Sequence, residues 1–237
     1  MTSPRIVAID GPSGAGKSTV AKALAERLHV PYIDTGAMYR AIGLAARERG
    51  VTLPVTEPDT VASIAESVSL DLDVSGGDTR VRVDGRDVTD AIRLPEISVY
   101  ASAVSAIPAV RRRLVAEQRR LAAGNGGVLE GRDIGTRVFP QTPYKFYLTA
   151  PLAVRAERRA RELALRGTPQ PQDVVRAEIE RRDRDDSTRS DSPLTLDETY
   201  TVVDTGRREI GEIVDELEAR IRERSAEPAG WGQVRRT

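Results

Sequence analysis

A glycine-rich loop between an apolar run and a helical pattern constrains this chain more than any other feature. The run Ile6–Asp10 precedes Gly-Pro-Ser-Gly-Ala-Gly-Lys-Ser-Thr at 11–19, and apolar residues at helical spacing follow. Strand, loop and helix in this order are the context of a phosphate-binding loop, because glycines let backbone N–H groups surround phosphate oxygens. The N-terminus of the helix adds a partial positive charge. A turn that binds nothing is the alternative, but spacing, lysine and serine all agree with nucleotide binding.

We therefore predict that a nucleoside triphosphate binds this loop. Lys17 is expected to reach the β- and γ-phosphates, and the Ser18 hydroxyl is expected to be a ligand of Mg²⁺. The predicted contacts are Gly11, Pro12, Ser13, Gly14, Ala15, Gly16, Lys17, Ser18 and Thr19.

Composition narrows the class of protein further. The 36 Lys and Arg residues balance 36 Asp and Glu residues. The chain thus lacks the basic excess of nucleic-acid binders, and we expect no nucleic-acid partner. The absence of cysteine excludes disulfides and zinc–thiolate sites. No apolar run has the length of a membrane span or a signal region, so we predict no membrane partner and a cytoplasmic location. The single His29 is assigned a surface or helix-capping position.

Short apolar strand signals alternate with helical patterns along most of the chain. This alternation predicts an α/β fold, with a parallel sheet flanked by helices. Gly50, Gly124 and Gly167 each follow a helical pattern, where a left-handed cap is expected. The strand signals lie at 5–10, 32–34, 128–130, 144–148 and 201–204.

Two segments interrupt this alternation. Apolar residues at every second position around residues 70–83, with turn residues between them, predict a small antiparallel sheet in an inserted lobe. A densely charged stretch of both signs further along predicts a helical hairpin. The expected divisions are a core of 1–58, 106–154 and 190–224, an inserted lobe of 59–105, the hairpin of 155–189, and a disordered tail of 225–237.

Three further motifs place charged side chains near the ends of strands or helices. Asp34-Thr-Gly-Ala-Met-Tyr-Arg40 is equally consistent with a helix cap and with a guanidinium that binds phosphate. Glu130-Gly-Arg-Asp-Ile-Gly135 follows a strand, so its loop is expected to face the nucleotide crevice. For Arg182-Asp-Arg-Asp-Asp-Ser-Thr-Arg189 the charge pattern alone favours a surface ladder of ion pairs.

These motifs, together with the loop at 11–19, resemble those of the bacterial cytidylate kinases. All four occur in the order found in that family, and the resemblance covers about 6–223. It implies the fold of P-loop nucleoside-monophosphate kinases, with 59–105 as the lobe that binds the monophosphate and 155–189 as a lid. Thr35 stands where many relatives have serine, and Glu130 where others have aspartate. Both substitutions keep the functional group.

The resemblance also implies an acceptor site that binds CMP. The catalytic residues implied are Lys17, Arg132 and Arg189. Implied contacts of the acceptor phosphate are Arg40, Arg132 and Arg189. Thr35, five residues before Arg40, is also implied to bind CMP. Implied contacts of the cytosine are Ser102, Arg111 and Asp133, with Ser105 as an alternative serine. Implied contacts of the sugar are Tyr39, Arg182 and Asp186. Lid arginines implied to contact ATP are Arg155, Arg158 and Arg159.

The expected reaction is phosphoryl transfer from MgATP to CMP or dCMP. The acceptor phosphate is already a nucleophile at neutral pH, so the arginines have only to neutralise charge and align the two nucleotides. One alternative is a small kinase for a hydroxyl acceptor, with Asp34 as its general base. The other is a nucleotide-dependent switch, which would lack an acceptor site. Relatives in the family suggest a monomer.

Overall fold

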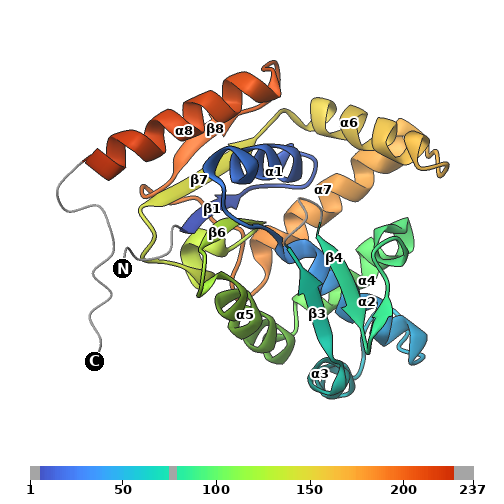
Figure 1. Cartoon of the computed structure of the whole chain (residues 1–237). Coiled ribbons are helices and arrows are strands. Elements are labelled where there is room, and N and C mark those ends of the chain that lie inside the picture. The colour runs from blue at the N-terminus through green and yellow to red at the C-terminus, as the bar shows by residue number, and fades with distance from the viewer. Residues whose placement is uncertain (1–5, 75–78, 227–237) are drawn as a thin grey trace.

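A five-stranded parallel sheet forms the centre of the protein (Figure 1). The computed structural model describes residues 6–74 and 79–226. The strand order is β2-β6-β1-β7-β8. In the register of the sheet, Asp10 at the end of β1 pairs with Gly131 of β6 and Tyr147 of β7. The glycine-rich loop therefore begins beside the loop that follows β6. The strands are β1 Ile6–Asp10, β2 Tyr32–Asp34, β6 Gly127–Gly131, β7 Tyr144–Thr149 and β8 Thr201–Asp204.

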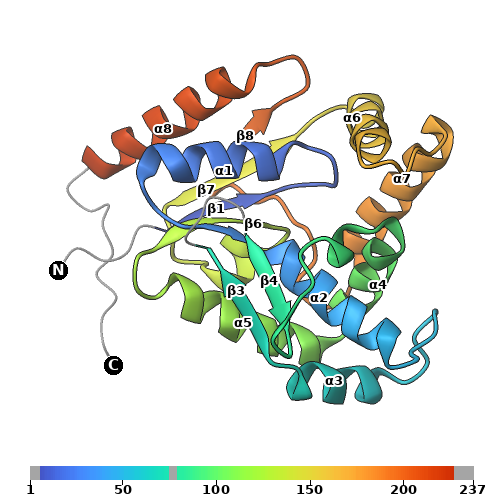
Figure 2. The ribbon, with the colours of Figure 1, turned by 45° about the vertical axis from the view of Figure 1, so that its right-hand side comes forward.

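Helices pack on both faces of this sheet (Figure 2). Helices α1 (Lys17–Leu28) and α8 (Ile210–Ala226) cover one face and share a core with β1, β7 and β8. Helix α5 (Pro108–Ala122) packs on the other face through a core that includes Ile33 and Leu129. The predicted α/β architecture is confirmed. None of the described helices combines the length and the apolar character needed to span a membrane.

The inserted lobe packs on α2 (Thr35–Glu48), which leads from the core toward it. Its three-stranded antiparallel sheet has the order β3-β4-β5, as the alternating pattern predicted. Gly43 of α2 allows α4 to approach closely, since a Cβ at Gly43 would lie 2.9 Å from the backbone nitrogen of Ala101. The elements of the lobe are α3 Pro58–Ser67, β3 Leu70–Asp73, β4 Arg80–Val83, β5 Arg86–Asp87, the 3₁₀ turn η1 Ala91–Arg93, and α4 Pro95–Ser105.

Two helices, α6 (Leu152–Leu165) and α7 (Gln172–Thr188), form the predicted charged hairpin. They pack on each other through a small apolar core of Ala156, Leu163, Val175 and Ile179. The hairpin stands beside the inserted lobe at the side of the sheet where the glycine-rich loop lies (Figures 1 and 2). Loop, lobe and hairpin thus border a common region.

Local predictions at helix ends are mostly confirmed. His29 is the exposed C-cap of α1, with φ 54°, and its N–H donates to the carbonyls of Ala25 and Glu26. Gly50 and Gly167 take φ 83° and 75°. The prediction for Gly124 is wrong: the turn before β6 instead places Gly126 at φ 72°, and the N–H of Gly126 donates to the carbonyl of Ala122.

Helix α8 continues into the segment that was predicted to be a tail. It ends at Ala226, and the Ser225 hydroxyl donates to the Ile221 carbonyl at 2.6 Å. Residues 227–237 lie outside the described residues, as do 1–5 and 75–78 in the predicted hairpin turn.

Candidate active site

The loop between β1 and α1 has the conformation that phosphate binding requires. Gly14 and Gly16 take φ 76° and 81°, which side chains of other residues rarely allow. A Cβ at Gly14 would also lie 3.0 Å from the backbone oxygen of Arg155. The Lys17 ammonium lies back over the loop and donates to the Pro12 carbonyl at 2.7 Å. The Ser13 N–H donates to the Asp183 carboxylate at 3.2 Å, so the loop also contacts α7.

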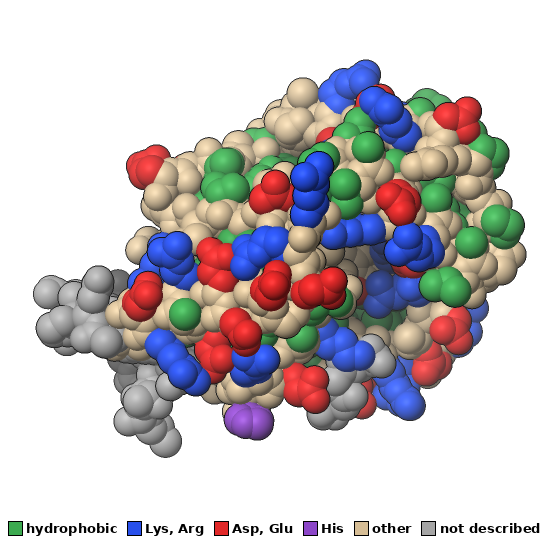
Figure 3. Space-filling model, turned by 90° about the horizontal axis from the view of Figure 1, so that it is seen from above, with side chains coloured by type: hydrophobic (Ala, Val, Ile, Leu, Met, Phe, Trp, Pro, Cys, Tyr) green, Lys and Arg blue, Asp and Glu red, His purple; other side chains and the backbone are tan. Residues whose placement is uncertain are grey.

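A polar crevice of about 530 Å³ opens beside this loop. The surface view shows Lys and Arg side chains gathered around a hollow (Figure 3). The crevice joins the loop to segments far away in the sequence, because α2, η1, the loop after β6, α6 and α7 all contribute cations to it. These cations are Lys17, Arg40, Arg93, Arg132, Arg158, Arg159, Arg166 and Arg182.

The three lid arginines predicted to contact ATP occupy different positions. Arg158 and Arg159 line the crevice. Arg158 extends to Thr205, donating to its hydroxyl at 3.0 Å and to its carbonyl at 2.6 Å. Arg155 is buried and supports the loop from outside the crevice, with bonds to the carbonyls of Ser13 and Ala150, each at 3.0 Å. The geometry therefore favours Arg158 and Arg159 for direct nucleotide contact.

Three cations of the crevice are crowded and buried, and their pKa values are lowered as a result. Burial, with the nearby charge of Arg132, lowers the pKa of Lys17 to about 7. Burial and Arg182 lower the pKa of Arg40 to about 9. The pKa of Arg182 is itself lowered by burial and by Arg132. A polyanion bound here would relieve this repulsion, so the crevice is electrostatically suited to phosphates.

A second, smaller pocket lies behind the crevice and contains a buried ion pair. Arg111 of α5 bonds to the carboxylate of Asp133, and their side chains are only 3% and 6% exposed. Arg111 also donates to the Ser105 carbonyl at 3.2 Å, and its guanidinium lies over the Tyr39 ring, 5.4 Å from the centroid. The pair places an acceptor carboxylate beside a donor guanidinium, which suits recognition of a polar base edge.

The charged motif at 182–189 faces this pocket. Asp186 is 5% exposed and accepts from Arg132, 54 residues away, at 2.7 Å. The surface-ladder interpretation is therefore wrong. Nε of Arg182 and Nη2 of Arg189 are buried and have no hydrogen-bond partner among the described residues. These donors remain available for a bound anion or hydroxyl.

The two pockets are continuous. Both are lined by Gly36, Gly131, Arg132 and Arg182. A ligand in the small pocket can therefore extend a phosphate toward the glycine-rich loop. The structure brings together in the small pocket Thr35, Tyr39, Arg111, Arg132, Asp133, Arg182, Asp186 and Arg189.

The two serines considered for base recognition lie differently. Ser105 lines the small pocket, and its hydroxyl donates to the Ser102 carbonyl at 2.8 Å. Ser102 lines the adjoining space between α4 and α7, where Arg182 and Arg189 also contribute. In this conformation Ser105 is therefore the serine in the small pocket, while Ser102 is one helical turn away.

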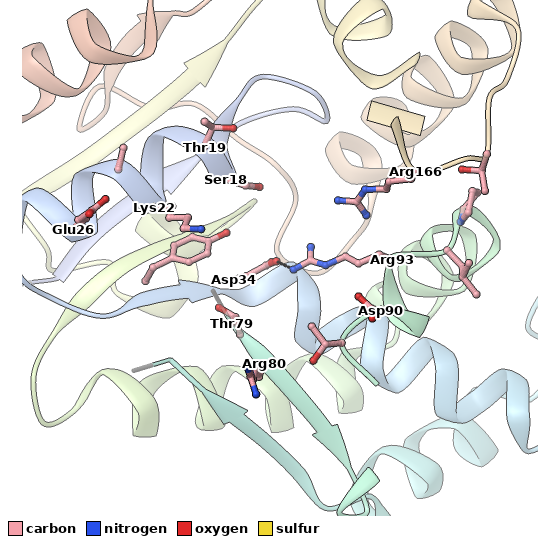
Figure 4. A pocket seen from close by; sticks show the side chains of 16 residues that line it. Ser18, Thr19, Lys22, Glu26, Asp34, Thr79, Arg80, Asp90, Arg93 and Arg166 are labelled. Atoms are coloured by element: carbon pink, nitrogen blue, oxygen red, sulfur yellow. Dashed lines mark ion pairs between the residues drawn. The ribbon is translucent and has the colours of Figure 1, made fainter. Parts of the chain in front are cut away.

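Sequence reasoning missed Arg93, which the inserted lobe supplies. Its guanidinium pairs with the Asp34 carboxylate at 2.9 Å in the space between α1 and the lobe (Figure 4). This space has a volume of about 960 Å³ and adjoins the crevice through Ser18. Arg93 belongs to a short 3₁₀ turn with no motif of its own, so no local signal could have identified it.

The oxygen donors beside Ser18 fit a hard divalent cation. Ser18 is exposed to the crevice and lines it together with Glu130 of β6. The described residues contain no cluster of three or more His, Cys, Asp or Glu side chains that would hold a metal alone. Mg²⁺ bound here would take its other ligands from phosphates and water, which is its usual behaviour at nucleotide sites.

Comparison with known proteins decides the family. A model of the cytidylate kinase family matches residues 7–223. The chain belongs to the cytidylate kinase family. A protein named cytidylate kinase from Geobacter sulfurreducens is 44% identical over 229 residues, which cover 95% of this chain and 96% of that relative. Family membership and the geometry thus agree on a nucleotide kinase.

Two other known proteins resemble this chain, one over only part of its own length and the other in fold alone. A bifunctional pantoate ligase/cytidylate kinase from Synechococcus sp. (strain JA-2-3B'a(2-13)) is 44% identical over 213 residues, which are 90% of this chain but 39% of that protein. The chain thus spans about two fifths of the length of that bifunctional relative of the cytidylate kinase family. A crystal structure of an uncharacterized protein from Eubacterium ventriosum has a TM-score of 0.50 at 14% identity, covering 92% of this chain and 98% of that one. It shows a common fold alone.

Proposed function

We propose that this chain transfers the γ-phosphoryl group of ATP to CMP or dCMP, giving CDP or dCDP. One observation carries the proposal: the crevice at the glycine-rich loop and the small pocket with Arg111 and Asp133 share Arg132 and Arg182 in their walls. A triphosphate on the loop and a monophosphate in the pocket would meet at these two guanidinium groups. Family membership supports the same reaction.

The chemistry asks for charge neutralisation and alignment. The acceptor phosphate is a nucleophile at neutral pH, so no general base is needed, and the protein must hold two polyanions in line. Arg40, Arg132 and Arg189 would hold the acceptor, while Lys17 would contact the phosphates of the donor. Mg²⁺ at Ser18 and Glu130 would neutralise part of the triphosphate charge when bound. Closure of α6 and α7 would exclude water and limit hydrolysis of ATP.

Cytosine recognition follows from the hydrogen-bonding groups of the base. Cytosine presents an amino donor beside two acceptors. The Asp133 carboxylate would accept from the amino group, and the Arg111 guanidinium would donate to an acceptor. Uracil presents a carbonyl where cytosine has the amino group, which would place oxygen against carboxylate. A mismatch of this kind in a buried site can discriminate strongly.

The position of Asp34 argues against a hydroxyl acceptor. Such a substrate needs a general base, and Asp34 is the carboxylate that the sequence offers. One Asp34 oxygen accepts from the Ala37 N–H at 2.9 Å as a helix cap, and the other pairs with Arg93 at 2.9 Å. Both oxygens are therefore engaged. A switch protein is also disfavoured, because the small pocket would then have no ligand.

A coupled assay of ADP release tests the proposal. The chain would be incubated with MgATP and, in turn, CMP, dCMP, UMP, AMP and shikimate. We expect release with CMP or dCMP to exceed release with UMP or AMP, and no release with shikimate. Stimulation by shikimate or AMP alone, or equal slow release under all conditions, would contradict the proposal. The monomeric state and the cytoplasmic location remain predictions from the sequence.

A further inference from the structure

We propose that Asp10 is a positioning residue that ties the acceptor-binding loop to the donor-binding loop. The inference rests on the proposed function and concerns a residue that contacts neither nucleotide. Asp10 ends β1, directly before Gly11, and its side chain is fully buried. Such a carboxylate is costly to bury unless its oxygens are satisfied.

Three donors converge on Asp10, and all belong to segments more than 120 residues away. The Ile134 N–H donates to Oδ1 at 2.9 Å, and the Gly135 N–H donates to Oδ2 at 2.8 Å. The Tyr200 hydroxyl donates to Oδ2 at 2.7 Å. Burial raises the pKa of Asp10, while these three hydrogen bonds oppose that shift. Because all three partners donate, the ionised carboxylate is the form that fits the site.

The two backbone donors follow directly after the acceptor residues. Arg132 and Asp133 precede Ile134 in the loop after β6, and the π-helical turn η2 (Ile134–Val138) begins there. The other contacts of these two acceptor residues lead elsewhere. Arg132 bonds to the lid through Asp186, and Asp133 bonds to Arg111 of α5. Asp10 therefore supplies a direct side-chain link between this loop and the strand that carries the donor loop.

The donor loop has supports that do not involve Asp10. The Pro12 carbonyl accepts from Lys17 at 2.7 Å, the Ser13 carbonyl accepts from Arg155 at 3.0 Å, and the Ala15 carbonyl accepts from the Thr205 hydroxyl at 2.9 Å. Loss of the Asp10 carboxylate should therefore disturb the acceptor loop more than the donor loop. This asymmetry separates a positioning role from general stabilisation of the fold.

The Asp10→Asn variant tests this role. Asparagine keeps the volume but has one acceptor oxygen, and its amide group would face a backbone donor. We expect KM for CMP to rise about tenfold, and the ratio of kcat/KM for CMP to that for UMP to fall about fivefold. KM for ATP should stay within about twofold of the parent value. Tyr200→Phe is the matched control, because it removes one donor and leaves both N–H bonds; its CMP to UMP ratio should equal that of the parent.

Amide hydrogen exchange gives a readout that does not depend on activity. The amides of Ile134 and Gly135 should be protected in the parent and in Tyr200→Phe, and should exchange at least about tenfold faster in Asp10→Asn. Gly135→Ala acts on the Gly135 N–H that donates to Asp10, because its Cβ would lie 2.6 Å from the Tyr200 hydroxyl oxygen and 3.0 Å from Cγ and Cδ of the buried Lys145, so the backbone at position 135 has to move. We expect the same rise in KM for CMP, so the test survives if Asp10→Asn does not fold.

The outcomes separate the two proposals. A parent enzyme without CMP-dependent ADP release refutes the proposed function, while amide exchange still tests the link. An active parent with unchanged KM and nucleotide ratio in Asp10→Asn, or in Gly135→Ala, overturns the positioning role. Equal rises in KM for ATP and CMP also overturn it, because the carboxylate would then support the whole site. Unprotected Ile134 and Gly135 amides in the parent would show that the link is absent.

Discussion

Removing one member of the buried ion pair of Arg111 and Asp133 should lower the stability of the fold, and it should also abolish CMP binding. These two effects can be measured separately. The side chains are 3% and 6% exposed, so Asp133→Leu leaves a guanidinium buried without its counter-ion. Removing one partner of such a pair costs about 3–5 kcal/mol. For a chain of this size, each kcal/mol lowers Tm by about 2–4 °C, so we expect a decrease on the order of 10 °C.

The double variant Arg111→Met with Asp133→Leu is the informative control. It replaces both charges with apolar side chains of similar size, which is often close to neutral for stability. We expect its Tm to return to within about 5 °C of the parent. CMP binding should be lost in both the single and the double variant, because the groups proposed to bind cytosine are gone.

Thermal unfolding followed by circular dichroism and titration calorimetry with CMP would measure the two effects. A single variant whose free energy of unfolding stays within about 1 kcal/mol of the parent would refute the buried-pair reasoning. A double variant that regains stability and still binds CMP with the parent affinity would refute the role of the pair in base recognition.

Three further predictions concern other residues of the site. Lys17→Ala should abolish phosphoryl transfer and leave the calorimetric affinity for CMP within about threefold; normal turnover would exclude Lys17 from catalysis. The pKa of Lys17 is lowered to about 7, so the unfolded chain binds more protons at this residue between pH 7 and 10, and stability should rise with pH there. Urea unfolding should show that Lys17→Met reduces this rise, and an identical pH dependence in both proteins would contradict the shift. Arg93→Ala should raise KM for CMP by about tenfold, whereas Arg47→Ala, which loses an exposed pair with Glu96, should not; equal effects would deny Arg93 a specific role.

The features that the sequence predicted correctly are those set by residues close together in the chain. The glycine-rich loop needs glycines, a lysine and a serine at fixed spacing, and all occur within residues 11–19. The antiparallel sheet of the inserted lobe was likewise predictable, because alternation around Leu72 and Val81 specifies a buried face. Both depend on short-range rules of backbone geometry and side-chain periodicity.

Residues whose role depends on distant partners could not be assigned from local pattern. The charges at 182–189 resemble a solvated ladder, and only the approach of Arg132 reveals that Asp186 is buried. Arg93 has no motif, and its role becomes visible only when the lobe packs near Asp34. Arg155 was predicted, like Arg158, to contact ATP, but in the structure it donates to the Ser13 carbonyl of the glycine-rich loop. Long-range packing is the information that these patterns lack.

A crystal structure with CMP and ADP would test the central claim most directly. The account predicts the CMP phosphate among Arg40, Arg132 and Arg189, and the cytosine edge against Arg111 and Asp133. The phosphate should face the glycine-rich loop that holds ADP. Cytosine bound away from this buried pair, or CMP absent at saturating concentration, would contradict the account.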